Sequence, residues 1–103
     1  MEPTEPWLAR HTARAPVALR ERVFQHVQAA PPGDSVAETL AEASREALRQ
    51  VELDPAAGRP VALDLLAADA LITLALLAQA QEQPSGLQDF ATDLLQHPVG
   101  RRD

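Results

Sequence analysis

Apolar residues recur at helical spacing over residues 16–30. At about 3.6 residues per turn, they fall on one side of a helix. They are Val17, Leu19, Val23, Phe24 and Val27. Pro16 suits the first helical position because its φ angle is already helical, and Pro31, Pro32 and Gly33 follow the last position. The pattern therefore predicts a helix over 16–30.

A capping box marks the start of a second helix. Ser35 stands three residues before Glu38, and in such a box each side chain satisfies a backbone N–H of the first turn. We expect this helix to end near residue 52. Its apolar side consists of Val36, Leu40, Ala43, Ala47 and Val51.

A second capping box, Ser85 with Gln88, follows Pro84 and predicts a helix over 86–96. The apolar residues of this helix recur at three- and four-residue spacing, as expected for one buried face. They are Leu87, Phe90, Ala91, Leu94 and Leu95.

The segment 60–82 is apolar on almost every side of the helix that it predicts, interrupted mainly by Asp64, Asp69 and Thr73. Such a helix needs neighbours on several sides. It is also long enough to span a bilayer, but each aspartate would cost roughly 2.5–3.5 kcal/mol near the bilayer centre. No cluster of Lys and Arg and no aromatic belt flanks it. We therefore expect a buried helix and no membrane insertion.

The composition favours helices over sheets, because Ala and Leu supply most of the apolar residues and aromatic residues make up 3%. The sequence predicts an all-α fold, a small helical bundle of four main helices with a long central apolar helix. We expect an N-terminal segment docked by Trp7 over residues 1–15. The helical bundle domain is predicted over 16–97, and a frayed tail over 98–103.

The net charge of −6 disfavours nucleic acid as a partner. Four arginines lie near the N-terminus, but glutamates are interspersed among them. These residues are Arg10, Arg14, Arg20 and Arg22, with Glu2, Glu5 and Glu21. The absence of cysteine excludes a disulfide framework, a thiolate zinc site and a Cys nucleophile. Together with an N-terminus unlike a secretory signal, it indicates a cytoplasmic protein.

Asp64, Asp69 and Arg20 are the candidate buried polar residues, because each falls on an apolar helix surface. One interpretation is structural: the helix dipole favours Asp64 in the first turns, and Asp69 pairs with Arg20. The alternative is a bundle that binds a small molecule or metal through these three residues. Five residues apart, the two aspartates point about 140° from each other, and no Glu-x-x-His pair accompanies them.

No other motif specifies a chemistry. His11, His26 and His97 lack a second ligand at zinc spacing, so we expect surface histidines. Of the serines Ser35, Ser44 and Ser85, two are better explained as helix caps. The glycines form no phosphate-binding loop. We expect no cofactor, and nothing in the sequence specifies an enzyme.

The apolar surface of the helix over 60–82 exceeds what three short neighbours can cover. We therefore predict a homodimer or a complex with a protein partner, with this helix at or beside the interface. The interface candidates are Ala68, Leu71, Ala75 and Ala78. The predicted function is a non-enzymatic interaction or regulatory module, and the alternative is the small-molecule or metal binder described above.

Overall fold

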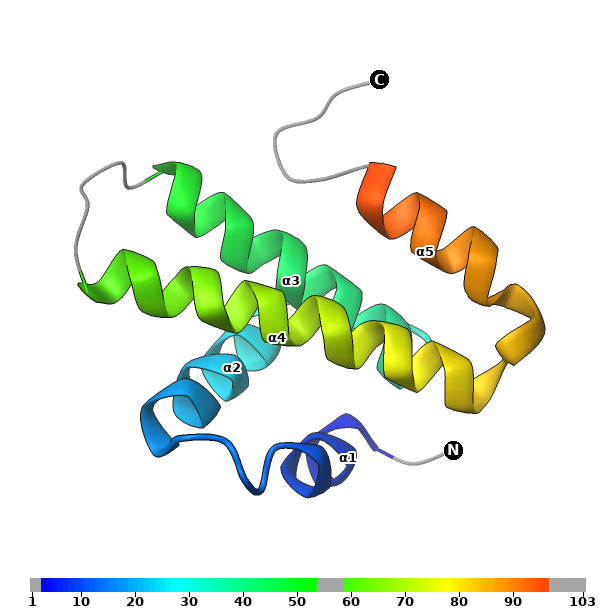
Figure 1. Ribbon diagram of the computed structural model, residues 1–103, viewed down its shortest axis with the longest axis horizontal. Coiled ribbons are helices and arrows are strands. Elements are labelled where there is room, and N and C mark those ends of the chain that lie inside the picture. Colours follow the sequence, from blue (N-terminus) through cyan, green and yellow to red (C-terminus); the bar gives the residue numbers. More distant parts are fainter. Residues whose placement is uncertain (1–2, 54–58, 97–103) are drawn as a thin grey trace.

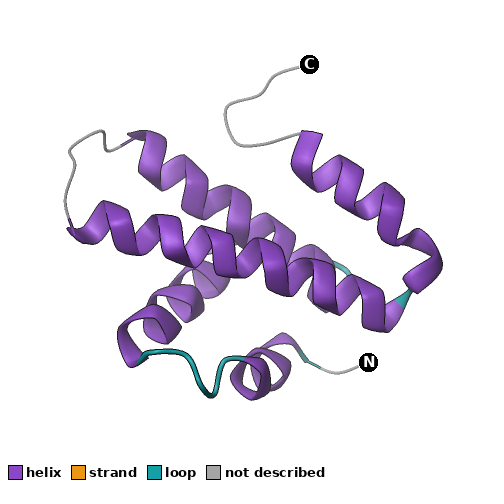
Figure 2. Ribbon diagram, in the orientation of Figure 1, coloured by secondary structure: helices purple, strands orange, loops and turns teal. Residues whose placement is uncertain are grey.

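The structure, a computed structural model, describes residues 3–53 and 59–96. Within these ranges the chain forms five α-helices and one 3-10 turn and contains no strand (Figures 1 and 2). The elements are α1 (Thr4–His11), α2 (Val17–Ala29), α3 (Val36–Leu53), α4 (Arg59–Glu82), η1 (Pro84–Gly86) and α5 (Leu87–Gln96). The all-α prediction is confirmed. The helix count is corrected from four to five, since the N-terminal segment contributes α1.

The four predicted helices begin and end within a residue or two of their predicted bounds. Pro16 precedes the first helical residue of α2 and serves as its N-cap. Ser85 lies inside the 3-10 turn, where the Gly86 N–H donates to the Gln83 carbonyl at 3.0 Å. It is therefore not the residue that caps α5. The predicted tail, 98–103, lies outside the described residues.

The turn between α2 and α3 is closed by the first capping box. The Glu38 N–H donates to Ser35 Oγ at 3.1 Å, whereas the Glu38 carboxylate accepts from the Asp34 N–H, one residue earlier than expected. The Gly33 N–H donates to Thr39 Oγ1 at 2.9 Å. A Cβ at Gly33 would lie 2.7 Å from the Glu38 Cβ, so this close approach requires glycine.

The centre of the core is the contact between α3 and α4, the most extensive between two described elements. Fully buried alanines line it from both helices, and small side chains allow the helix axes to approach closely. They are Ala37, Ala43, Ala47, Ala67, Ala75 and Ala78. Leu40 and Leu71 are the large, fully buried residues of this pair.

The other helices pack around the α3–α4 pair. Helix α2 contacts both α3 and α4, α5 packs against α4, and α1 contacts α3 (Figure 1). Trp7 of α1 is buried, stacks on His11 and donates from Nε1 to Gln81 Oε1 of α4 at 3.0 Å. Of the predicted bundle, the structure thus shows one extensive helix pair, α3 with α4, and smaller contacts between this pair and the other helices.

Helix α4 is buried on one side only. Leu65 and Leu66, on the opposite side, remain 48% and 57% exposed. The expectation that this helix is covered on nearly every side is therefore wrong for the single chain. Val61–Glu82 is long and apolar enough to cross a membrane, and 28% of its most apolar stretch is buried within the chain.

The alanine-lined contact predicts sensitivity to larger side chains. Ala75→Leu should lower the free energy of unfolding by about 1 to 3 kcal/mol, because α3 leaves no room for three more carbons. Ala18→Leu, at an exposed position of α2, should change it by less than about 0.5 kcal/mol. Urea denaturation followed by circular dichroism measures both, and equal effects would refute the close packing.

Candidate functional site

The most buried charged cluster joins α2 to the second turn of α4. Asp64 Oδ1 lies 3.0 Å from His26 Nε2 and 3.3 Å from an Arg22 guanidinium nitrogen. The side chains of His26 and Asp64 are 9% and 15% exposed, and that of Arg22 is 31% exposed. A carboxylate that loses water at this position is thus compensated by two nitrogen groups, as burial of a charge requires.

Helix periodicity brings the two nitrogen groups together. Arg22 and His26 are four residues apart on α2, so their side chains lie on one face of that helix. His26 also lies next to Val23 and Val27 on the buried side of α2. Because α2 packs against α4, this face meets Asp64.

This cluster differs from the predicted one. Arg20 donates to the Ala13 carbonyl at 3.3 Å, and Asp69 is exposed. The predicted burial of Asp69 and its pairing with Arg20 are therefore wrong. Arg20 lies about 200° around the helix from Arg22, and Asp69 lies about 140° around α4 from Asp64, so the structure does not bring the three candidates together.

His26 was expected at the surface and is buried. Its position three residues after Val23 and directly before Val27, within the apolar stripe of α2, was the signal for burial. Its spacing of four residues from Arg22 was the signal for a shared acidic partner.

The polar groups of the cluster pair with one another. Within residues 3–53 and 59–96, no group of three or more His, Asp or Glu side chains could hold a metal ion. The Ser44 hydroxyl donates to the Ala41 carbonyl, and Ser35 caps α3. In the same ranges every buried side-chain nitrogen and oxygen has a hydrogen-bond partner. The arrangement therefore holds α2 against α4.

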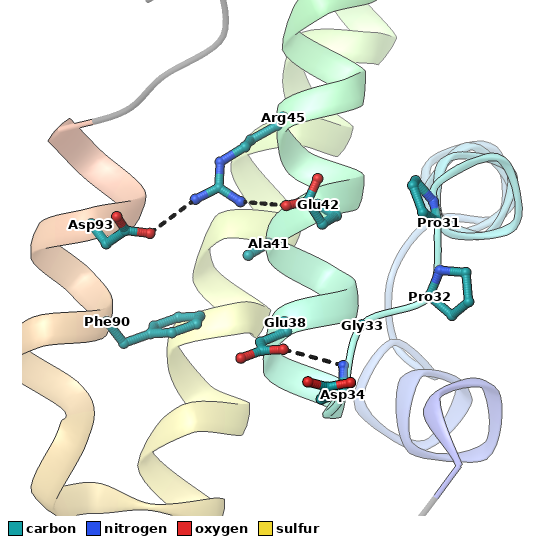
Figure 3. A pocket seen from close by; sticks show the side chains of 10 residues that line it. All are labelled: Pro31, Pro32, Gly33, Asp34, Glu38, Ala41, Glu42, Arg45, Phe90 and Asp93. Atoms are coloured by element: carbon teal, nitrogen blue, oxygen red, sulfur yellow. Dashed lines mark hydrogen bonds and ion pairs between the residues drawn. The ribbon is translucent and has the colours of Figure 1, made fainter. Parts of the chain in front are cut away.

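A groove of about 510 Å³ separates α3 from α5 (Figure 3). Its charged lining is mostly acidic. Arg45 pairs with Glu42 of its own helix at 3.0 Å and reaches across the groove to Asp93 of α5 at 3.4 Å. Phe90 points from α5 toward α3 (Figure 3). The Arg45–Asp93 ion pair connects the two helices, so the basic group of the groove already has carboxylate partners.

The side of α4 turned away from α3 is the candidate interaction surface, and we call it the outer face. It consists of Ala62, Leu65, Leu66, Asp69, Thr73, Leu76, Leu77 and Ala80. Leu76 and Ala80 are half-exposed and the other members are exposed. Three of the five large exposed apolar residues of the described chain, Leu65, Leu66 and Leu77, lie here. In Figure 1, α4 crosses in front of α3, and no described element lies in front of it.

The predicted interface residues lie on the other side of α4. Ala68, Leu71, Ala75 and Ala78 are at most 1% exposed and belong to the core of the chain itself. The alanines among them allow close approach, as expected, but the elements packed on them belong to the same chain. They are buried within the chain, whereas the outer face is exposed.

The Asp64 cluster predicts different effects for two neighbouring arginines. Arg22→Met should lower the free energy of unfolding by about 1 kcal/mol or more, because it removes the ion-pair partner of a half-buried carboxylate. Arg20→Met should change it by less than about 0.5 kcal/mol, since Arg20 has only an exposed bond to lose. Urea denaturation of both variants at neutral pH is the measurement. A larger loss for Arg20→Met would show that the pairing is incorrect.

Comparison of the chain with protein-family models, with curated proteins and with solved structures finds no match.

Proposed function

We propose that this chain is a non-enzymatic interaction module that binds protein, either another copy of itself or a partner, through the outer face of α4. The observation that supports this most strongly is the exposure of Leu65, Leu66 and Leu77 along one side of a single regular helix. Single exposed apolar residues are normal, but a contiguous apolar surface on a soluble domain is typical of a binding site.

Covering the outer face would contribute favourable free energy to association. Full burial of a leucine side chain contributes about 1.5–3 kcal/mol, and Leu65, Leu66 and Leu77 are 48%, 57% and 38% exposed. Since α3 already holds α4 in place, the backbone of α4 loses little conformational entropy on binding. A partner on this face would also give α4 the central, bundle-like position that its sequence pattern predicts.

The charges favour protein over other occupants. The chain carries a net charge of −6, and Asp69 lies in the middle of the outer face. Phosphate backbones and anionic lipid surfaces are repelled by such a field. The absence of cysteine is consistent with the proposed location in the cytoplasm.

The small-molecule or metal alternative has weaker support. Asp64 is occupied by His26 and Arg22, and Asp69 lies on a different side of α4. The proposal therefore includes no cofactor.

Two matched cysteine variants test whether the outer face is covered by another molecule. The sequence has no cysteine, so Thr73→Cys on the outer face and Thr92→Cys on an exposed side of α5 each carry a single thiol. In its native host, the Thr73→Cys chain should react with a membrane-permeant maleimide more slowly than the Thr92→Cys chain. The difference should be about tenfold if nine chains in ten are bound, because only the unbound fraction reacts.

The two thiols should react at equal rates in denaturant, which controls for their intrinsic reactivity. If Thr73→Cys reacts as fast as Thr92→Cys in the native state, the outer face is uncovered and the proposed function is wrong.

A further inference from the structure

The outer face has a self-complementary order of residues. Along its centre the residues follow one another at alternating spacings of four and three. They are Ala62, Leu66, Asp69, Thr73, Leu76 and Ala80. Counted outward from Leu71 in both directions, a polar residue comes first, then leucine, then alanine. The face therefore presents the same sequence of side-chain types from either end.

Spacings of four and three average 3.5 residues, which is the repeat by which two helices pack in a coiled coil. When two identical copies of such a helix run in opposite directions about a twofold axis at the level of Leu71, position i faces position 142 − i of the second copy. Ala62 then faces Ala80, Leu66 faces Leu76, and Asp69 faces Thr73. Each layer pairs residues of matching size and polarity.

We infer that the occupant of the outer face is a second copy of this chain, packed with its α4 antiparallel to the first about a twofold axis at Leu71. This inference rests on the proposed function and specifies its partner. A twofold contact of this kind uses the same surface on both copies, so it closes at a dimer and leaves neither outer face uncovered.

The polar layer selects the antiparallel direction. In this arrangement the Thr73 hydroxyl of one copy donates to the Asp69 carboxylate of the other, and the bond occurs twice. A parallel pair would place Asp69 against Asp69, where two like charges about 4 Å apart repel by roughly 1–4 kcal/mol near a protein surface. The antiparallel dimer weakens that repulsion, because it places the two carboxylates four residues apart along the helix axis, about 6 Å at 1.5 Å per residue.

The same layer also fixes the register. A shift by one heptad would place Leu66 against Asp69 in one direction and Leu76 against Thr73 in the other. Either shift places an apolar side chain against a polar one and leaves the carboxylate without its hydroxyl. Buried polar residues at core positions of paired helices specify register in this way.

Disulfide trapping tests both direction and register. Ala62→Cys and Ala80→Cys are purified separately, one of them labelled with heavy nitrogen, then mixed and mildly oxidised. The antiparallel dimer predicts that most cross-linked species have the intermediate mass of one labelled and one unlabelled chain. Each variant alone should cross-link poorly, because its two thiols lie eighteen residues apart along the helix axis, about 27 Å at 1.5 Å per residue.

Each outcome has a distinct meaning. Efficient cross-linking of each variant with itself would indicate a parallel pair and overturn the inference. A mass of one chain, 11.1 kDa, without cross-links would show a monomer and would also overturn the inference. If Thr73→Cys is nonetheless protected in the host, a different protein covers the face and the proposed function stands. If it is unprotected, both fail. Co-flotation of the purified chain with phosphatidylcholine vesicles would identify lipid as the occupant of the outer face and would overturn the inference.

A charge-swap pair tests the same geometry without cysteines. Leu66→Glu and Leu76→Lys should each weaken self-association at least tenfold, measured by sedimentation velocity, because each homodimer then contains two charges facing leucines. A mixture of the two variants should recover association. In the antiparallel heterodimer, one layer becomes Glu with Lys and the other stays Leu with Leu.

Urea denaturation of each variant alone shows whether it is folded. Recovery on mixing cannot arise from variants that fail to fold, and a parallel dimer predicts none, since neither layer would then contain both charges. Failure of two folded variants to recover association would overturn the antiparallel arrangement.

Discussion

The close contact between α3 and α4 is the constraint on which the rest of the structure depends. Ala43 and Ala47 on one helix and Ala67, Ala75 and Ala78 on the other are fully buried. Small residues at a contact let the axes of two helices lie closer together than large residues do. Because the side of α4 with Ala67, Leu71, Ala75 and Ala78 is buried, the leucines at 65, 66 and 77 lie on other sides of the helix. The internal packing of the chain thus determines which surface remains exposed.

Each peripheral helix is attached to this pair by a specific polar contact as well as by apolar packing. Helix α2 is joined to α4 through Asp64, α1 through the bond from Trp7 to Gln81, and α5 is joined to α3 through Arg45 and Asp93. The Arg45–Asp93 pair is well exposed, and such pairs contribute at most about 1 kcal/mol. The Asp64 cluster is more buried, so loss of one of its partners would have a larger effect.

Local signals in the sequence were enough to predict the helices. Prolines, the Ser35–Glu38 capping box and apolar spacing placed their ends within a residue or two, because these signals act over one helical turn. The second capping box misled, since the backbone after Pro84 forms a 3-10 turn around Ser85. The choice of Arg22 over Arg20 as the partner of Asp64 depends on how α2 is rotated against α4, which no local pattern encodes.

The direction in which α4 faces the core was also beyond the sequence, because apolar residues surround this helix and define no single buried side. Alanines that permit close approach fit equally well against another helix of the same chain or against another chain, and those predicted for an interface lie in the core of the chain itself.

Asp69 is the residue that makes the outer face more compatible with protein than with lipid. At the centre of a bilayer, its carboxylate would raise the free energy of insertion by roughly 2.5–3.5 kcal/mol, because lipid tails offer no hydrogen-bond donor. In water it is solvated, as is Thr73, the other polar residue of the outer face. In the proposed antiparallel dimer, it would accept a hydrogen bond from the Thr73 hydroxyl of the other copy. A single polar layer can therefore serve the free chain and the dimer, whereas in a membrane it would only be unfavourable.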